Sequence, residues 1–180
     1  MSSDQELIIE FQKSIDREAN FTALLKRHQQ KVYYQIKRMV SDHFEADEIA
    51  QLVWIKIWDK LDSFKMESEF TTWLFRITYN ETLNYLQKQK KHQNKLSQND
   101  IADYEYATAS TDNPKATEIQ IVLDRAISQL PEKQKVVFML RYFEGLDYEK
   151  IASIVGTSIG GAKANYHQAV KKVERFMKEL

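Results

Sequence analysis

Lys163, His167 and Lys171 recur at intervals of four residues near the C-terminal end of the chain. On an α-helix this spacing places the three side chains on one face, and Gly160 falls on the same face. No acidic residue shares it. Such side chains can contact phosphate oxygens and base edges, and a glycine lets backbone amides approach a phosphate closely. The pattern predicts a surface that binds nucleic acid.

The surrounding segment, residues 147–172, supplies the elements that this face needs. Asp147 can cap a short helix, Gly156 can adopt the left-handed conformation that ends it, and Thr157 or Ser158 can cap a second helix. This layout predicts a helix-turn-helix whose second helix enters the major groove of DNA. An ordinary helical hairpin with a solvated basic face is the alternative. The second helix has an apolar stripe at spacings of three and four, formed by Ala162, Tyr166, Ala169 or Val170, and Val173.

The DNA contacts expected from this unit lie at the start and along the exposed face of its second helix. Asn165 lies toward the flank of that face and can pair with an adenine edge if the helix is rotated to suit. The residues expected to contact DNA are Ser158, Gly160, Gly161, Lys163, Asn165, His167 and Lys171.

Composition limits the fold and the function. The 180 residues include four Gly, all after residue 144, and two Pro, so we expect long helices and an all-α fold. There are 26 basic and 26 acidic residues, and a chain of zero net charge gains little from counterion release on DNA. Tight DNA binding therefore requires a partner that supplies most of the affinity.

Cofactor and membrane classes are not indicated. The chain has no Cys, which excludes disulfides and cysteine-ligated metal, and we expect neither cofactor nor metal. There is no secretory signal and no apolar run of membrane-spanning length, so we expect no membrane insertion and a cytoplasmic location. An enzyme is not predicted, because the Walker, G-x-G-x-x-G and H-E-x-x-H motifs are absent and the four His are scattered.

The predicted helix over residues 44–61 has two contrasting faces. One is a core face, with Ala50, Val53, Trp54, Ile57, Trp58 and Leu61. The opposite face should be polar, but Leu52 and Ile55 lie there among Glu48, Gln51 and Asp59. An apolar spot with a polar rim indicates a protein interface. Coverage by another part of the same chain is an equally open alternative.

The predicted helix over residues 69–93 also has two bands. Its core stripe is Phe70, Trp73, Leu74 and Ile77. A second band mixes hydrogen-bonding and aromatic groups, which can stack on or grip unpaired bases. The helix then becomes basic at Lys88, Lys90, Lys91 and Lys95, which indicates either a phosphate contact or a solvated helix end. The second band consists of Thr72, Arg76, Tyr79, Asn80, Leu83 and Gln87.

Residues 98–114 lack Lys and Arg, contain four acids and end in Asn-Pro, which predicts a flexible acidic linker. Helices are predicted over residues 117–129 and from Pro131 to Gly145. The fold expected is therefore all-α, with two small helical domains joined by a flexible acidic linker and the helix-turn-helix in the second.

The order of these parts resembles the extracytoplasmic-function (ECF) sigma factors of bacterial RNA polymerase. The first domain carries the resemblance in FTALLKRHQQKVYYQIKRMV, DEIAQLVWIKIW and FTTWLFRITYNETLNYLQKQKK. The second carries it in LPEKQKVVFMLRYFEGLDYEKIASIVGTSIGGAKANYHQAVKKVERF. The resemblance implies a sigma domain two over residues 1–95, a linker over 96–116 and a sigma domain four over 117–180. It also implies core RNA polymerase, promoter DNA and an anti-sigma factor as partners.

The resemblance also implies roles for individual residues. Leu52 stands where an acid is common, which removes one polar contact to polymerase that other members make, and Asn84 replaces a frequent aspartate. Gly161, Asn165 and Gln168 stand where Thr and two Arg are common, so the promoter sequence is not transferred from other members. A stand-alone helix-turn-helix regulator is the remaining alternative, and the first half would then have to supply its sensor. The residues implied to bind polymerase are Asp47, Glu48, Gln51, Leu52 and Ile55. Those implied to contact the minus-ten element are Ser63, Phe64, Lys65, Thr72, Arg76, Tyr79, Asn80, Asn84 and Lys88. The helix from Ser158 is implied to read the minus-thirty-five element.

Overall fold

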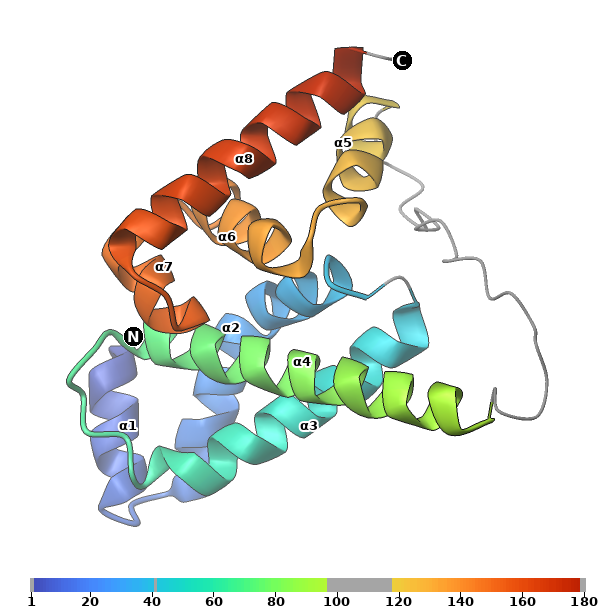
Figure 1. Ribbon diagram of the computed structural model, residues 1–180. Coiled ribbons are helices and arrows are strands. Elements are labelled where there is room, and N and C mark those ends of the chain that lie inside the picture. Colours follow the sequence, from blue (N-terminus) through green and yellow to red (C-terminus); the bar gives the residue numbers. More distant parts are fainter. Residues whose placement is uncertain (1, 41, 97–117, 179–180) are drawn as a thin grey trace.

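A computed structural model describes residues 2–40, 42–96 and 118–178, and within these ranges the chain contains helices and no strands (Figure 1). The all-α fold is confirmed. The predicted linker lies outside the described residues. The helices are α1 (Asp4–Gln12), α2 (Arg17–Lys37), α3 (His43–Leu61), α4 (Phe70–Leu96), α5 (Glu118–Ser128), α6 (Glu132–Tyr142), α7 (Tyr148–Val155) and α8 (Ile159–Lys178).

Helices α1 to α4 pack around one apolar core. Phe11 on α1 is fully buried, and its ring meets Trp58 of α3 edge-on at 5.1 Å between centroids. The Arg17 guanidinium lies 3.9 Å from the centre of the Phe11 ring and forms a two-pronged ion pair with Asp62. Aromatic edge-to-face and cation–π contacts of this kind add to the energy of area burial. They fix the start of α2 against the end of α3.

Helices α5 to α8 form the second group. Asp147 caps α7 by accepting from the amide of Lys150 at 2.8 Å, and Gly156 follows the helix in the left-handed conformation, with φ of 69°. Ser158, rather than Thr157, caps α8, since its hydroxyl accepts from the amide of Gly161 at 3.0 Å. The predicted helix-turn-helix is therefore confirmed. Its apolar stripe is buried or half-buried at Ala162, Tyr166, Ala169, Val170 and Val173.

Two details of the second group differ from expectation. Ile119 has the three- and four-residue spacing of an apolar side with Val122, Leu123 and Ala126, but it is exposed, because α5 packs on α8 through its later turns, at Ala126 and Ile127. Pro131 was expected inside the first turn of α6, but it is the residue just before the helix. Its fixed φ suits either position, so the start of the helix is unaffected.

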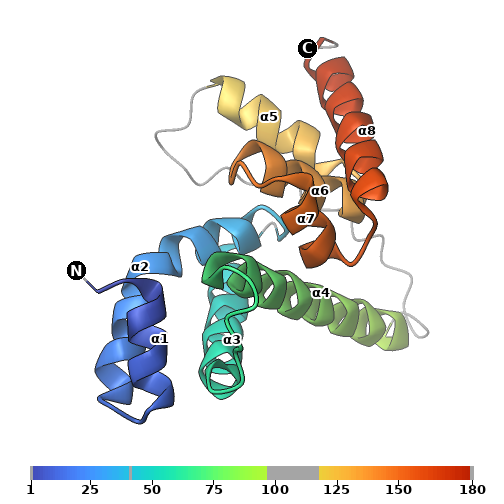
Figure 2. The same ribbon diagram turned by 90° about the vertical axis from the view of Figure 1, so that its left-hand side faces the viewer.

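The two groups touch where α7 lies on the first half of α4 (Figures 1 and 2). A second point of contact joins the end of α2 to the end of α6, where the Arg38 guanidinium lies 3.8 Å from the centre of the Phe143 ring. Burial lowers the pKa of Arg38, while the carboxylates of Glu144 and Asp124 raise it. The helix-turn-helix is thus held against the helix that carries most of the predicted minus-ten residues.

Candidate functional site

The outer face of α3 is apolar at its centre and uncovered. The side chains of Leu52 and Ile55 are 44% and 60% exposed, whereas Val53 and Ile57 are fully buried. The two-faced helix is confirmed, and no other part of the chain that the structure describes covers the outer face. Phe44, at 80% exposure, extends the same stripe by one turn and was missed from the sequence. Its spacing of four from Glu48 would have placed it there.

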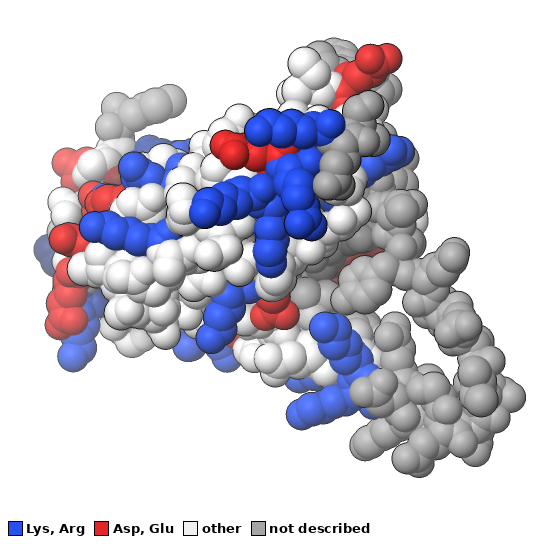
Figure 3. Space-filling view, turned by 45° about the horizontal axis from the view of Figure 1, so that its top comes forward, with Lys and Arg blue, Asp and Glu red and all other residues white. Residues whose placement is uncertain are grey.

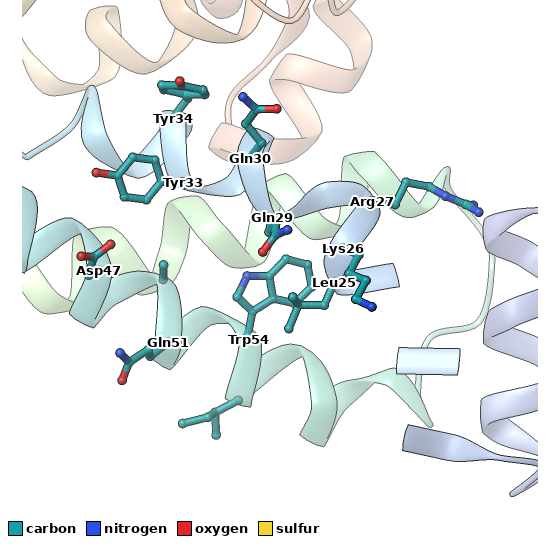
Figure 4. Close-up of a pocket in the computed structure, with 12 residues that line it drawn as sticks. Leu25, Lys26, Arg27, Gln29, Gln30, Tyr33, Tyr34, Asp47, Gln51 and Trp54 are labelled. Carbon is teal, nitrogen blue, oxygen red and sulfur yellow. The ribbon is translucent and has the colours of Figure 1, made fainter. Parts of the chain in front are cut away.

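Next to this face, α2 and α3 line an open groove of about 900 Å³ (Figure 4). Trp54 and Leu25 give it an apolar floor, and Asp47 and Gln51 stand on its α3 side. The sequence analysis did not identify the α2 side, because polar residues on the exposed side of a helix are ordinary and give no signal of a groove. That side contributes Lys26, Arg27, Gln29, Gln30, Tyr33 and Tyr34.

Carboxylates surround the apolar centre of α3. Asp47 Oδ2 lies 3.4 Å from Nε2 of His43, one turn earlier on the helix. A spacing of four residues on a helix predicts such a surface contact. Glu48 accepts a hydrogen bond of 2.8 Å from the hydroxyl of Tyr85 on α4. Burial raises the pKa of Glu45, and the carboxylates of Asp42 and Glu48 raise it further. The α3 surface therefore offers an apolar strip with an acidic margin, which suits a partner helix with a basic rim.

The predicted minus-ten residues divide into two sets. The predicted residues in the second half of α4, and two residues in the loop before α4, are exposed and so are free to contact a strand of DNA. The exposed set is Ser63, Lys65, Asn80, Asn84 and Lys88. Thr72 and Tyr79, by contrast, are only 3% and 4% exposed, and Arg76 is half-buried. The first half of the band predicted on α4 is therefore not open to solvent; α7 packs on α4, and Arg76 contacts Ser153 of α7.

Phe64 requires a correction, because the structure does not present it at the surface. Its ring packs 4.8 Å from Trp73 and 6.0 Å from Phe70 between centroids, and the side chain is buried. The resemblance implied a DNA contact for Phe64 in this connection, but the loop folds the Phe64 ring onto the start of α4. Phe64 therefore positions the loop that carries Ser63 and Lys65.

The band on α4 contacts the second group through polar groups. Arg76 donates from Nη2 to the Ser153 hydroxyl of α7. Burial raises the pKa of the Tyr79 hydroxyl, and the carboxylate of Glu132 on α6 raises it further. The atoms Arg76 Nε and Thr72 Oγ1 are buried without a hydrogen-bond partner among the described residues.

The α8 face is mostly as expected. Gly160, Lys163, His167 and Lys171 are exposed, and Lys and Arg side chains gather over the C-terminal helices in Figure 3. Asn165 differs, because it is half-buried and its amide donates to the carbonyl of Gly161 at 2.8 Å. Free rotation toward a base edge would require that bond to break.

Gly161 also has a role inside the protein. A Cβ atom at this position would lie 2.6 Å from Thr157 Oγ1 and 3.1 Å from Ser158 Oγ, so the Thr157 side chain would have to shift before a larger residue could stand there. A Cβ at Gly160 would meet nothing nearer than Ser158 Oγ, at 4.0 Å. Packing inside the protein therefore accounts for a glycine at position 161 but not for a glycine at position 160.

Comparison with known proteins assigns both helical groups. Residues 24–92 match the family described as Sigma-70 region 2, and residues 120–173 match Sigma-70, region 4. The RNA polymerase sigma-H factor of Pseudomonas aeruginosa is 30% identical over 98% of this chain and 95% of its own length. The ECF RNA polymerase sigma-E factor of Haemophilus influenzae is 31% identical over 99% of this chain and 97% of its own.

Solved structures share the fold. The sigma factor RpoE, in a complex with the anti-sigma factor NepR from Bartonella quintana, matches with a TM-score of 0.75 at 24% identity, covering 88% of this chain and 97% of that one. CnrH, in a complex with the cytosolic domain of CnrY, matches with a TM-score of 0.72 at 17% identity over 99% of each chain.

The two family matches show that the chain belongs to the sigma-70 family of bacterial transcription initiation factors, and the two groups of helices with a helix-turn-helix in the second agree with that. Within that family it is an ECF sigma factor, a protein that binds core RNA polymerase and directs it to promoters. This excludes the stand-alone regulator. No helix in the described ranges has the length and apolar character needed to cross a membrane.

Proposed function

We propose that the outer face of α3 is the surface by which this sigma factor docks on core RNA polymerase. The observation that carries the proposal is the apolar pair Leu52 and Ile55, exposed on a helix whose opposite face is fully packed. Exposed apolar residues at the centre of a polar rim are the usual anchors of a protein interface. Asp47, Glu48 and Gln51 form the rim.

The promoter contacts are assigned to two further surfaces. The loop residues Ser63 and Lys65 and the band on α4 contact the minus-ten element, and the exposed face of α8 reads the minus-thirty-five element. The domain bounds that go with this assignment are residues 1–95 for polymerase binding and the minus-ten element, 96–116 for the linker and 117–180 for the minus-thirty-five element. Such a factor works in the cytoplasm, without a cofactor.

Control by an anti-sigma factor completes the proposal. The RpoE structure holds a sigma factor together with the anti-sigma factor NepR, and the CnrH structure holds CnrH together with the cytosolic domain of CnrY. The groove between α2 and α3 supports a shared docking surface, because a helix laid in it would contact Trp54 and Gln51 and would block the α3 face.

A pair of matched variants tests the docking face. Ile55→Asp puts a charge into a contact that must lose its water, at a cost of about a few kcal/mol of binding energy. Ile15→Asp makes the same change at 53% exposure, in the turn after α1. Ile55→Asp should abolish retention on immobilised core polymerase and run-off transcription, whereas Ile15→Asp should behave as the wild type. Both should melt at the wild-type temperature. Equal retention of the two variants would show that α3 is not the docking face.

A further inference from the structure

The side-chain amide of Gln12, the last residue of α1, donates to the backbone where α3 ends. Its Nε2 atom lies 2.9 Å from the carbonyl oxygen of Leu61 and 2.9 Å from that of Phe64, with the carbonyl of Asp62 at 3.5 Å. An amide NH2 group has two hydrogens, so the two short bonds use both of them. The last carbonyls of a helix have no partner within that helix. Gln12 therefore caps α3 from outside and joins its end to the loop that follows.

Arg17, the first residue of α2, holds the same place from a second side. Its guanidinium donates two bonds of 2.8 Å to the carboxylate of Asp62 and lies 3.9 Å from the centre of the Phe11 ring. The pair is partly exposed, and an exposed pair adds little net stability. A two-pronged pair nevertheless fixes the direction of both side chains. Its geometry, more than its energy, defines where the loop begins.

Helix α1 is itself fixed at both ends, so it can act as a rigid support. At its start, Asp4 pairs with Arg27 and with Nε2 of His28 on α2, the latter at 2.8 Å. Near its end, the Phe11 side chain is fully buried. The match to Sigma-70 region 2 covers residues 24–92, so α1 and the start of α2 precede the matched segment. The support for the loop thus comes from a part of the chain that this match does not assign.

The loop after α3 directs alternate side chains to the core and to solvent. Phe64 and Met66 pack against the core. Ser63 and Lys65 are exposed, and the Ser63 hydroxyl donates to the carbonyl of Lys60 at 2.8 Å. Met66 has a φ of 57°, a left-handed conformation that a residue with a side chain keeps only where its surroundings impose it. The loop is therefore held in one shape, with its exposed side chains at defined positions.

We propose that Gln12 is a positioning residue that sets which minus-ten base the loop after α3 accepts, and that Arg17 assists it. The proposal rests on the minus-ten role proposed above for Ser63 and Lys65. Gln12 acts through the carbonyl of Phe64, because that carbonyl belongs to the peptide bond between the two exposed residues. A base is selected by hydrogen-bonding groups held in place, so a loop that is free to shift would accept several bases.

Gln12→Met tests the positioning role, and Gln5→Met is its matched control. Methionine is close to glutamine in length and in helix propensity but cannot donate a hydrogen bond. Gln5 lies on the same helix and is exposed. Asp62→Asn weakens the second tie, since it removes the charge that Arg17 meets. Ser63→Ala removes a proposed base contact itself and so reports whether the loop reads DNA.

The measurement is run-off transcription by holoenzyme from a promoter mapped with the wild type and from a panel in which each minus-ten base pair is replaced in turn. Gln5→Met should keep the wild-type preference at every position. Gln12→Met should lose about two- to tenfold of the preference at the positions that Ser63→Ala alters, the factor that one lost hydrogen bond corresponds to. Asp62→Asn should relax the same positions by less. Preference for minus-thirty-five bases should stay the same in all variants.

Hydrogen exchange on the free full-length chain gives a second readout. Gln12→Met should speed exchange of the amides in residues 62–66, while the amides within α3 and α4 stay protected. Gln12→Asn keeps an amide but stops one carbon short of the carbonyls. It should give the same relaxed profile, and it replaces Gln12→Met if that variant does not fold.

The outcomes separate the positioning role from a role in stability alone. Weaker transcription from all promoters with an unchanged preference profile would mean that Gln12 only stabilises the fold, and the proposal would be wrong. A profile altered by Ser63→Ala but not by either Gln12 variant would refute the positioning role and leave the minus-ten role of the loop standing. A profile altered by none of them would remove the minus-ten role of the loop and the positioning role with it.

Discussion

Alanine at Gly160 and alanine at Gly161 should have opposite effects on stability, although the two residues are adjacent in the first turn of α8. Both positions are helical, so either substitution gains about 0.5–1 kcal/mol of helix propensity. The new Cβ at Gly160 enters open space. At Gly161 it would lie 2.6 Å from Thr157 Oγ1, and such overpacking costs about 1–3 kcal/mol. Gly160→Ala should therefore stabilise, and Gly161→Ala should destabilise by up to about 2 kcal/mol.

Urea unfolding followed by two probes separates the helical groups. The three Trp residues, Trp54, Trp58 and Trp73, all lie in α3 and α4, so their fluorescence reports the first group, whereas far-UV circular dichroism reports both. Both substitutions lie in α8, so they should shift the unfolding midpoint of the second group, which is seen by circular dichroism alone. The midpoint measured by tryptophan fluorescence should not change.

The control removes Thr157 Oγ1, the atom that a Cβ at position 161 would meet. Thr157→Ala combined with Gly161→Ala should recover the stability lost by the single change, because Oγ1 is gone. If Gly161→Ala is as stable as Gly160→Ala without this relief, the steric argument is wrong. Gly160→Ala carries the functional result, since a methyl group there would hold the backbone away from a phosphate. It should weaken binding of holoenzyme to upstream promoter DNA while leaving the fold intact, and unchanged binding would remove Gly160 from the DNA contacts.

Two further outcomes are expected. Lys171→Ala should lower the affinity of holoenzyme for upstream DNA almost equally for all sequences and flatten the salt dependence by about one unit, measured by competition between promoter variants; a loss confined to one base pair would instead make Lys171 a base reader. Phe11→Ala should destabilise the first group by about 3–5 kcal/mol in urea unfolding followed by fluorescence, since the ring is fully buried against Trp58; a loss below about 1 kcal/mol would mean that the site collapses to fill the space.

Local patterns were enough to predict the elements and their faces. The outer face of α3 follows from a helical wheel, because the positions of Leu52 and Ile55 relative to Val53 and Ile57 depend only on helix geometry. The caps of the helix-turn-helix likewise depend on one or two neighbouring residues, as with Asp147 and Gly156. Such features need no knowledge of distant contacts, so the sequence contains them in full.

Features that depend on distant or non-repeating contacts were not predictable. Phe64 lies in a loop without a period, and only the folded chain brings its ring onto Trp73. Asn165 lies on the expected flank of α8, but its bond to the Gly161 carbonyl uses a side-chain rotation that spacing does not specify. The α2 side of the groove gave no signal, because residues such as Gln30 and Tyr33 are ordinary on a half-exposed helix.

The band on α4 shows why a residue pattern alone does not identify its partner. Hydroxyl, guanidinium and phenol groups at Thr72, Arg76 and Tyr79 suit unpaired bases, since they can donate hydrogen bonds and stack. The same groups suit a polar helix face, and here Arg76 donates to Ser153, 77 residues further along the chain. The sequence specifies only that this band must meet a polar partner. For Arg76 that partner is Ser153 of α7, the first helix of the helix-turn-helix, which only the folded chain brings alongside α4.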